Sequence, residues 1–471
     1  MRVLTDNKPM FDLRTTFPRR VSIIGAGRSG IAAAEYFRKK DVALFISDSC
    51  PAEKLEKILS DNNLEGLRHE SGSHTTQVLK SDCIVLSPGV PSDLPIILEA
   101  KKRGIPVWSE MELGFRASDA TFLAVTGSTG KSTTVSFLGE ALKAGGKESV
   151  VAGNIGIPVI SVVAGMSKDG WVAAEVSSFQ LENIERFRPR GAAVLNLMKN
   201  HLDRYKSEED YYGAKKAIAR NYTKDNYVVL NLHDDRLVEW AGAMKKRTNV
   251  IFFGSAPGEG DTFWYDEDRE TIRYRFGGAQ GTILDVGDMR IGGRHNFENA
   301  CAAAALARLA GIDDASIGSG ITRFPGLPHR LEFAGEVRGV RYYDDSKSTT
   351  AESILAAVSA FRTGRVYLIA GGRDKGCDFS VVKSALRKYV SGVSLIGEAA
   401  GRMQAEWQGI VPLYRSATLE EAVAMAVRSA RSGEAVVLSP GCSSFDMFVD
   451  YRERGDRFKK IVAALAAERT A

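Results

Sequence analysis

The chain has 471 residues, of which 44% are hydrophobic and 26% are charged, as in ordinary soluble globular proteins. This length predicts about three domains, because a single hydrophobic core seldom grows beyond roughly 250–300 residues. The net charge of +5 is too small to indicate a nucleic-acid partner, although it is compatible with small anionic substrates. No apolar run reaches the roughly 20 residues of a membrane span, and residues 1–18 lack the apolar segment of a secretory signal.

The five cysteines are odd in number, and none forms a Cys-x-x-Cys pair. This usage indicates a reducing compartment and argues against a structural zinc site. We therefore predict a cytoplasmic protein that binds neither nucleic acid nor a membrane.

Short β-branched runs alternate with longer helical patterns throughout, which predicts an α/β fold with parallel sheets covered by helices. The first unit opens with a strand at residues 21–24, the run Gly25-Ala-Gly-Arg-Ser-Gly30 and a helix to residue 39. A second strand at residues 42–47 ends in Asp48, and a third at residues 83–86 is followed by Ser87. Glycines before a helix and an acid after the second strand predict a bound nucleotide diphosphate, dinucleotide or other.

The most informative segment is residues 127–133, which read Gly-Ser-Thr-Gly-Lys-Ser-Thr directly behind an apolar strand at residues 121–125. Its glycines can turn backbone N–H groups toward an anion, Lys131 adds charge, and the helix N-terminus adds partial positive charge. Val125 stands where the common phosphate-binding loop has glycine, so this is a tighter form. The alternative is a surface turn rich in glycine and serine. We predict a phosphate site formed by Gly127, Ser128, Thr129, Gly130, Lys131, Ser132 and Thr133.

Polar residues follow two further strands of the middle unit. Residues 171–174 lead into Glu175, and residues 192–195 lead into a segment that contains His201. Because ligands sit outside the carboxyl ends of parallel strands, both side chains should share an edge with Lys131. Glu175 is then a metal ligand or a salt-bridge partner, and His201 is functional or structural. A less regular, partly β stretch at residues 250–290 should decorate this unit.

The last unit begins near residue 327 and contains predicted strands at residues 340–343, 366–369, 393–396 and 435–438. Three polar runs follow these strands, at residues 344–349, 371–375 and 439–444. We expect them to meet at one edge of a second parallel sheet.

Four segments carry a family resemblance in order: the phosphate loop and residues 175–182, 200–205 and 211–215. Through them the chain resembles the Mur ligases, the ATP-dependent enzymes that build the peptide of the bacterial cell-wall precursor. His329-Arg330 and the run Asp344-Asp-Ser-Lys347 extend the resemblance over nearly the whole chain. The resemblance implies a UDP-sugar-binding Rossmann-like domain at residues 1–116, a central P-loop-type ATP-binding domain at 117–326, and a Rossmann-like amino-acid-binding domain at 327–471.

The Asp-Asp-Ser-Lys-Ser-Thr run is similar to that of the family member that adds D-glutamate to UDP-N-acetylmuramoyl-L-alanine. The resemblance implies these two small-molecule substrates, an acyl-phosphate intermediate and a monomer. Position 350 is threonine, whereas that family member more often has asparagine there. The alternative within the family is a ligase that adds a different amino acid.

The resemblance also implies two Mg²⁺ sites, one held by Ser132 and Glu175 and one by His201 with a carbamylated Lys215. The helical spacing of Lys215 from Tyr211, taken alone, favours the alternative of a lysine whose aliphatic stem packs on the core. Asp345 either accepts a proton or binds the nucleotide ribose. The implied catalytic residues are Lys131, His201, Lys215, Asp345 and Lys347.

The remaining implied contacts fall into three groups. ATP lies near Asn296, Asn299 and Arg330, where residues 293–299 precede an alanine-rich helix. The nucleotide sugar contacts Gly27, Arg28, Ser29, Asp48, Ser87, Gly89 and Asn154. The amino acid contacts Lys347, Thr349, Lys375, Ser444, Phe445 and Tyr451.

Two other classes of protein compete with this interpretation. A nicotinamide-dependent oxidoreductase would leave the Lys131 loop and residues 344–347 without a role. A non-catalytic nucleotide switch would not need Lys347 and Lys375.

Overall fold

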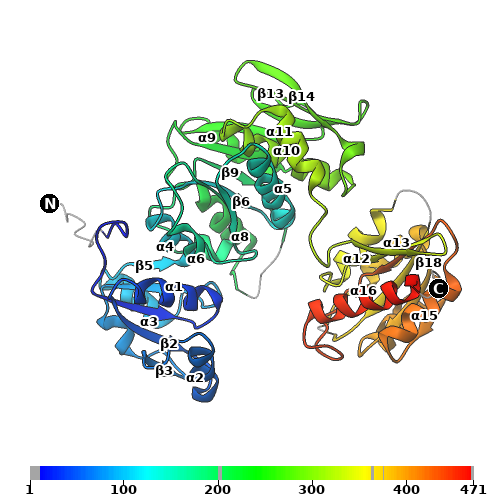
Figure 1. Cartoon of the computed structure of the whole chain (residues 1–471), viewed down its shortest axis with the longest axis horizontal. Helices are drawn as coiled ribbons and strands as arrows, with labels where there is room; N and C mark the ends of the chain where they lie inside the picture. Colours follow the sequence, from blue (N-terminus) through cyan, green and yellow to red (C-terminus); the bar gives the residue numbers. More distant parts are fainter. Residues whose placement is uncertain (1–10, 200–203, 362–364, 375, 468–471) are drawn as a thin grey trace. The chain divides into compact units, whose positions relative to one another are not determined.

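The computed structural model describes residues 11–199, 204–361, 365–374 and 376–467. The chain divides into two compact units, residues 1–324 and residues 325–471. The strands of the described residues form sheets of five, nine and six members, and helices cover each sheet (Figure 1). The predicted α/β class is confirmed, since most neighbouring strands run parallel.

The first sheet has the strand order β3-β2-β1-β4-β5, with every pair parallel. The direction of strand addition reverses between β1 and β4, which makes their carboxyl ends the expected ligand site. Gly30, in the first turn of the helix that follows β1, lets that helix approach this edge, because a Cβ there would lie 1.9 Å from the Gly25 carbonyl oxygen. The elements are β1 (Arg20–Ile24), α1 (Arg28–Arg38), β2 (Ala43–Asp48), α2 (Ala52–Asp61), β3 (Arg68–Ser71), η1 (Thr76–Lys80), β4 (Cys83–Leu86), α3 (Pro95–Lys102) and β5 (Val107–Ser109).

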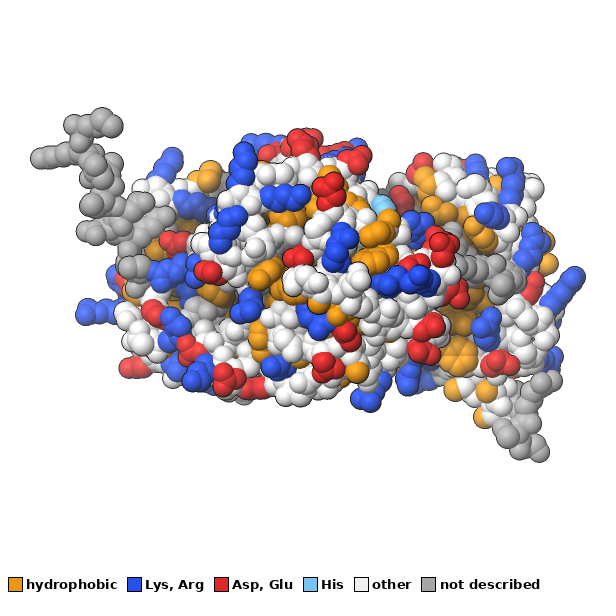
Figure 2. All heavy atoms as spheres, turned by 90° about the horizontal axis from the view of Figure 1, so that it is seen from above, with side chains coloured by type: hydrophobic (Ala, Val, Ile, Leu, Met, Phe, Trp, Pro, Cys, Tyr) orange, Lys and Arg blue, Asp and Glu red, His pale blue; other side chains and the backbone are white. Residues whose placement is uncertain are grey.

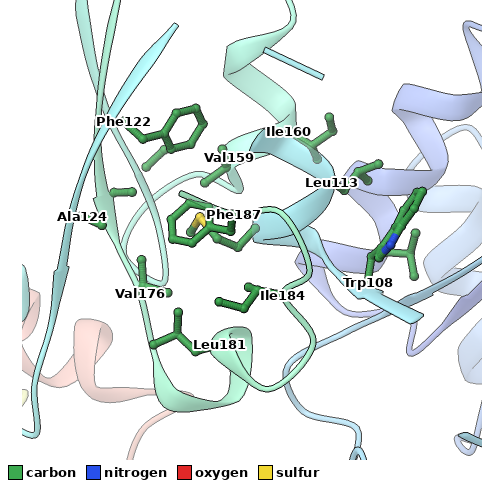
Figure 3. Close-up of a cluster of buried hydrophobic side chains, with 14 of the residues drawn as sticks. Trp108, Leu113, Phe122, Ala124, Val159, Ile160, Val176, Leu181, Ile184 and Phe187 are labelled. Carbon is green, nitrogen blue, oxygen red and sulfur yellow. The ribbon is translucent and has the colours of Figure 1, made fainter. Parts of the chain in front are cut away.

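Helix α4 (Glu110–Arg116) joins the first sheet to the second and packs closely on α6 (Val159–Val163). Gly114 permits the approach, because a Cβ there would lie 2.6 Å from Cγ1 of Val159. Figure 3 shows Leu113 of α4 in the same apolar cluster as Val159 and Phe187. The first and second sheets therefore share one continuous core.

A buried ion pair reinforces this junction. Glu112 accepts a hydrogen bond from Arg116 Nε at 2.6 Å and three more from the backbone N–H groups of Glu185, Arg186 and Phe187. Arg116 also contacts the Glu185 carboxylate at 2.7 Å. A buried ion pair is tolerated when its remaining polar atoms are satisfied in this way.

The second sheet has the order β14-β13-β12-β11-β10-β9-β6-β8-β7, parallel from β7 through β12. Its elements are β6 (Thr121–Thr126), α5 (Lys131–Ala144), β7 (Ser149–Gly153), β8 (Trp171–Glu175), α7 (Ser178–Leu181), β9 (Gly191–Val194), α8 (Glu208–Lys216), η2 (Ala217–Ala219), β10 (Tyr227–Asn231), α9 (Asp235–Met244), β11 (Asn249–Gly254), β12 (Thr262–Asp266), β13 (Thr271–Phe276), β14 (Ala279–Asp285), η3 (Val286–Asp288), α10 (Arg294–Leu309) and α11 (Asp314–Arg323).

Residues 250–290 are partly β, as predicted, but they are more regular than expected, because β11 and β12 continue the parallel ladder and β13 and β14 extend it antiparallel. One expectation for this sheet was wrong. Residues 293–299 do not precede the alanine-rich helix, since α10 already begins at Arg294 behind the glycine pair 292–293. Asn296 and Asn299 therefore lie one turn apart on α10.

The third sheet, in the second unit, has the order β15-β16-β20-β17-β18-β19, with only β15 antiparallel. Every residue of β17 and β20 is buried, as expected for central strands covered on both faces. The elements are β15 (Glu332–Val337), β16 (Val340–Asp344), α12 (Ala351–Ser359), β17 (Val366–Gly371), η4 (Phe379–Val382), α13 (Lys383–Tyr389), β18 (Val390–Ile396), α14 (Ala400–Trp407), β19 (Leu413–Arg415), α15 (Leu419–Ser429), β20 (Ala435–Leu438) and α16 (Tyr451–Ala467).

The surface carries both signs of charge. Figure 2 shows basic and acidic side chains interspersed over the face in view, in keeping with the small net charge. Among the described helices, none combines the length and the apolar character that crossing a bilayer requires.

Candidate active site

The predicted phosphate loop connects β6 to α5 and depends on two glycines. Gly127 has φ of 151° and Gly130 has φ of 81°, values that L side chains rarely adopt. A Cβ at Gly130 would also lie 2.5 Å from Oδ1 of Asn299. Asn299 on α10 thus lies against the loop, whereas Arg330, the third residue predicted near ATP, is exposed in the second unit.

Asn196, which follows β9, holds the first half of this loop. Its Oδ1 accepts hydrogen bonds from the N–H groups of Ser128 and Thr129, both at 2.9 Å. The Ser128 hydroxyl in turn donates to the Met198 carbonyl at 3.0 Å. Two backbone donors predicted to face phosphate are therefore engaged within the protein. The donors best placed for an anion are those at the start of α5.

Two lysines meet at the carbonyl oxygen of Gly127. Lys131 Nζ donates to it at 2.9 Å and Lys215 Nζ at 2.8 Å. Lys215 is only 2% exposed, and its ammonium also lies 4.6 Å from the centre of the Tyr211 ring. The pKa of Lys215 is lowered to about 7, chiefly by burial and also by the charge of Lys131, while Glu175 acts in the opposite direction. Lys215 is thus partly neutral near pH 7.

Ser207 explains why the helix around Lys215 begins where it does. Its side chain caps α8 by accepting the N–H of Asp210, and acidic residues fill the first turn. Tyr211 and Lys215 are both buried on α8, and Ile218 is buried beyond it in the 3₁₀ turn η2.

Glu175 closes β8 beside the loop, paired in register with Val125 of β6. It is 1% exposed, its Oε1 accepts from Asn154 Nδ2 at 2.7 Å, and its Oε2 is buried with no hydrogen-bond partner among the described residues. An orphaned carboxylate oxygen at the end of β8, next to the strand that leads into the loop, and a serine hydroxyl, that of Ser132 in the first turn of α5, are donor types that suit Mg²⁺. The residues present therefore fit the predicted metal. His201, the other predicted ligand with Lys215, lies outside the described residues.

The first sheet carries a cleft of about 440 Å³ at its switch point. All seven residues predicted to contact the nucleotide sugar line it: Gly27, Arg28, Ser29, Asp48, Ser87, Gly89 and Asn154. Asn154 and Pro158 come from the second sheet's domain, so the cleft spans the junction between the two domains of the first unit.

Asp48 shapes the glycine turn of this cleft. Its two carboxylate oxygens accept the N–H groups of Ala26 at 2.6 Å and Cys50 at 2.8 Å. Burial raises the pKa of Asp48, but these hydrogen bonds outweigh that effect and the net pKa is lowered. An ionised acid with engaged oxygens stabilises the loop and can still accept from a ribose hydroxyl.

Asn154 connects the cleft to the candidate metal ligand. Its N–H donates to the Glu175 carbonyl and its side chain to the Glu175 carboxylate. Gly153 before it needs its positive φ of 112°, and a Cβ there would lie 2.2 Å from the same carbonyl. The sugar-facing and phosphate-facing parts of the site are thus hydrogen-bonded neighbours.

In the second unit, the predicted residues gather at the carboxyl ends of β16 and β20. Asp345 accepts hydrogen bonds from the hydroxyls of Ser348 at 2.5 Å and Ser439 at 2.8 Å. Burial raises its pKa to about 6. Lys347 Nζ lies 3.9 Å above the Tyr451 ring. Of the other predicted residues, Ser444 is buried, Thr349 is half-buried, Phe445 is exposed, and Lys375 lies outside the described residues.

Several well-built residues were missed by sequence reasoning. Arg454 is fully buried on α16 and donates to Ser346 and to the Cys442 carbonyl, joining two of the polar runs. Arg204 and Glu182 form a half-buried ion pair at 3.1 Å. Their partners are 12 or more residues away in sequence, so local pattern carries no signal of the contacts.

Three family models match the chain in succession: Mur ligase MurD-like N-terminal domain at residues 19–109, Mur ligase middle domain at 125–307, and Mur ligase glutamate ligase domain at 329–442. Relatives called UDP-N-acetylmuramoylalanine--D-glutamate ligase are 40% identical in Geotalea daltonii, over 95% of this chain and 98% of that protein, and 38% identical in Koribacter versatilis, over 96% and 98%. The chain belongs to the Mur ligase family, which confirms the resemblance seen in the sequence.

Solved structures agree at the level of the fold. The UDP-N-acetylmuramate-alanine ligase of Thermotoga maritima aligns with a TM-score of 0.58 at 18% identity, covering 95% of this chain and all of that one. The MurF ligase of the same organism, solved in complex with ADP, aligns at 0.59 and 16% identity, covering 98% and 100%.

Proposed function

We propose that the chain joins the carboxylate of UDP-N-acetylmuramoyl-L-alanine to the amine of D-glutamate and converts ATP to ADP and phosphate. The observation that supports this proposal most strongly is the hydrogen bond between Asn154 of the cleft and Glu175 beside the phosphate loop. It brings a site for a nucleotide sugar next to a site for phosphate. The D-glutamate ligase name of the relatives and the 344–349 run support the choice of amino acid.

The chemistry requires activation, because a carboxylate and an amine do not form an amide in water. A carboxylate oxygen attacks the γ-phosphorus, ADP leaves, and an acyl phosphate results. The neutral amine then attacks the acyl carbon and phosphate leaves. The first step brings two anions together, so cations are needed to suppress their repulsion. Lys131 supplies one. Mg²⁺ held by Ser132 and Glu175 would supply further charge neutralisation.

Lys215 has the properties that carbamylation requires. Only a neutral amine adds to CO₂, giving a carbamate and one proton, and the pKa of about 7 provides that neutral form. The carbamate would turn a buried cation into an anion beside Lys131, and with His201 it would hold a second Mg²⁺. We assign Lys215 this role.

The second unit would bind D-glutamate. Lys347, Thr349, Lys375 and Ser444 offer cations and hydroxyls for its two carboxylates, with Phe445 and Tyr451 as apolar walls. Asp345 already accepts two hydroxyls and a backbone N–H, so we assign it to shaping this loop, with either proton acceptance or ribose binding as its direct role. We further propose that the protein acts in the cytoplasm, in keeping with substrates that are small soluble anions, and that it acts as a monomer.

The test is phosphate release with ATP, Mg²⁺ and UDP-N-acetylmuramoyl-L-alanine, with single amino acids added in turn. D-glutamate should stimulate release at least about tenfold, whereas L-glutamate, D-alanine and m-diaminopimelate should not. Equal stimulation by a neutral D-amino acid would contradict the assigned pocket. Stimulation by another amino acid alone would transfer the chain to a different member of the family.

A further inference from the structure

Arg204 bridges the wall of the nucleotide-sugar cleft and the body of the second domain. Its guanidinium donates to the carbonyl oxygens of Pro88 at 2.8 Å and Val90 at 3.0 Å, which bracket Gly89 of the cleft wall. The same group donates to Glu182 Oε2 at 3.1 Å and lies 4.3 Å from the centre of the Phe179 ring. The side chain is 16% exposed, so water competes little for these contacts.

The carboxylate of Glu182 accepts hydrogen bonds from Arg204 and from two other residues. Its Oε2 accepts from Ser92 Oγ at 2.5 Å as well as from Arg204, and its Oε1 accepts from the Tyr205 hydroxyl at 2.6 Å. Ser92 belongs to the first domain, in the loop that continues from the cleft wall. One carboxylate therefore binds both domains at a point close to the cleft.

The contacts continue to the phosphate loop. The Tyr205 ring stacks on Phe179 at 5.9 Å and tilts against Tyr211 at 5.3 Å. The Tyr211 hydroxyl lies 3.3 Å from the hydroxyl of Ser128, and the Tyr211 ring contacts Lys215. A contiguous set of packed side chains thus runs from the cleft wall to the phosphate loop.

We propose that Arg204, through its ion pair with Glu182, is a positioning residue that fixes the 87–90 wall of the cleft relative to the phosphate loop. The proposal rests on the proposed function of the cleft. Arginine suits the task because its planar fork serves two carbonyls and a carboxylate at once while its face stacks on an aromatic ring. A lysine at this position keeps the charge but has no fork to span these acceptors.

The experiment compares steady-state kinetics of Arg204→Lys with those of wild type. KM for UDP-N-acetylmuramoyl-L-alanine should rise at least about tenfold, the scale of losing charged hydrogen bonds, while KM for ATP changes less than about twofold. The matched control is Arg247→Lys, since Arg247 also donates to two backbone carbonyls, those of Ala219 and Arg220, away from the cleft. That control should leave all constants within about twofold.

Glu182→Gln gives an independent readout and decides the matter if Arg204→Lys does not fold. It keeps the shape of the side chain, removes the charge, and should raise the same KM about threefold or more. The double variant should be no worse than Arg204→Lys alone, because the two residues act as one unit. Additive losses, an equal rise in both KM values, or an unchanged sugar KM would overturn the proposal.

Direct binding separates this proposal from the proposed function. If wild type does not bind UDP-N-acetylmuramoyl-L-alanine in calorimetry, the assignment of the cleft fails. If wild type binds it and Arg204→Lys binds it equally tightly, only the role of Arg204 fails.

Discussion

Lys131 and Lys215 donate hydrogen bonds to one shared acceptor, the carbonyl oxygen of Gly127. Two ammonium groups at one buried carbonyl repel each other, and this repulsion adds to burial in lowering the pKa of Lys215. The arrangement leaves Lys131 as the cation that meets an incoming phosphate and Lys215 as the amine that can lose its proton. The surroundings of the two lysines therefore suit them to different roles, although both lie near the phosphate loop.

Replacing Lys131 by alanine should lower kcat at least about 10²-fold, the scale of losing one preorganised electrostatic contact at a charged transition state. The measurement is initial-rate phosphate release at saturating substrates. Lys143→Ala is the matched control, because Lys143 lies on the same helix α5 but pairs with Glu140 at the surface. Near-wild-type turnover in Lys131→Ala would refute the role of the loop.

The depressed pKa of Lys215 predicts a pH-dependent contribution to stability. Folded Lys215 loses its proton near pH 7, whereas an unfolded lysine keeps it to about pH 10.4, so between these values the unfolded chain binds more protons. The unfolding free energy of wild type should therefore rise with pH over this window, by up to about 1.4 kcal/mol per pH unit relative to Lys215→Met. Denaturant titrations in CO₂-free buffer measure this difference. A difference that is flat or falls as pH rises would contradict the burial of a titrating amine.

Lys215→Ala should lose most activity and regain part of it in acetate, since a short carboxylate can occupy the place of the carbamate. Chloride at equal ionic strength is the control, and the readout is product formation across an acetate titration. If formate, acetate and propionate all leave the variant inactive, the carbamate assignment is wrong.

The first-domain cleft should bind UDP but not NAD. Asp48 has one oxygen engaged with the glycine turn and the other with the Cys50 N–H, and Asn154 adds a polar side chain from the second domain, so the cleft suits a nucleotide sugar. UDP should compete with UDP-N-acetylmuramoyl-L-alanine in steady-state kinetics, and NAD at the same concentration should have no effect. Tight NAD binding would revive the dehydrogenase interpretation of the glycine-rich turn.

The sequence could predict the features that depend on local pattern. Glycines at left-handed positions, the apolar strand before them and the acid that closes β8 identify the phosphate loop and Glu175 because each signal lies within a few residues. The glycine turn, Asp48 and Ser87 of the cleft were likewise accessible from local pattern, since the carboxyl ends of parallel strands share one edge, whereas Asn154 was named only through the family resemblance.

What the sequence could not predict depends on contacts between distant segments. Arg204 reaches carbonyls 116 and 114 residues away, and Asn196 occupies N–H groups of the phosphate loop from another strand. Every residue has a backbone carbonyl, so a sequence pattern does not indicate which of them will accept a hydrogen bond. Such partners can be identified only from the three-dimensional structure. The pattern of residues 250–290 predicts a less regular, partly β stretch, whereas tertiary pairing completes strands on both sides of its glycine-containing turns.

The most direct test of the account follows one oxygen atom. UDP-N-acetylmuramoyl-L-alanine labelled with ¹⁸O in its free carboxylate is turned over with ATP, Mg²⁺ and D-glutamate, and the released phosphate is analysed by mass spectrometry. An acyl phosphate formed at the Lys131 loop requires that one carboxylate oxygen leave with the phosphate, so each phosphate should carry one ¹⁸O. Phosphate without ¹⁸O, released while the amide forms, would contradict the proposed chemistry of this site.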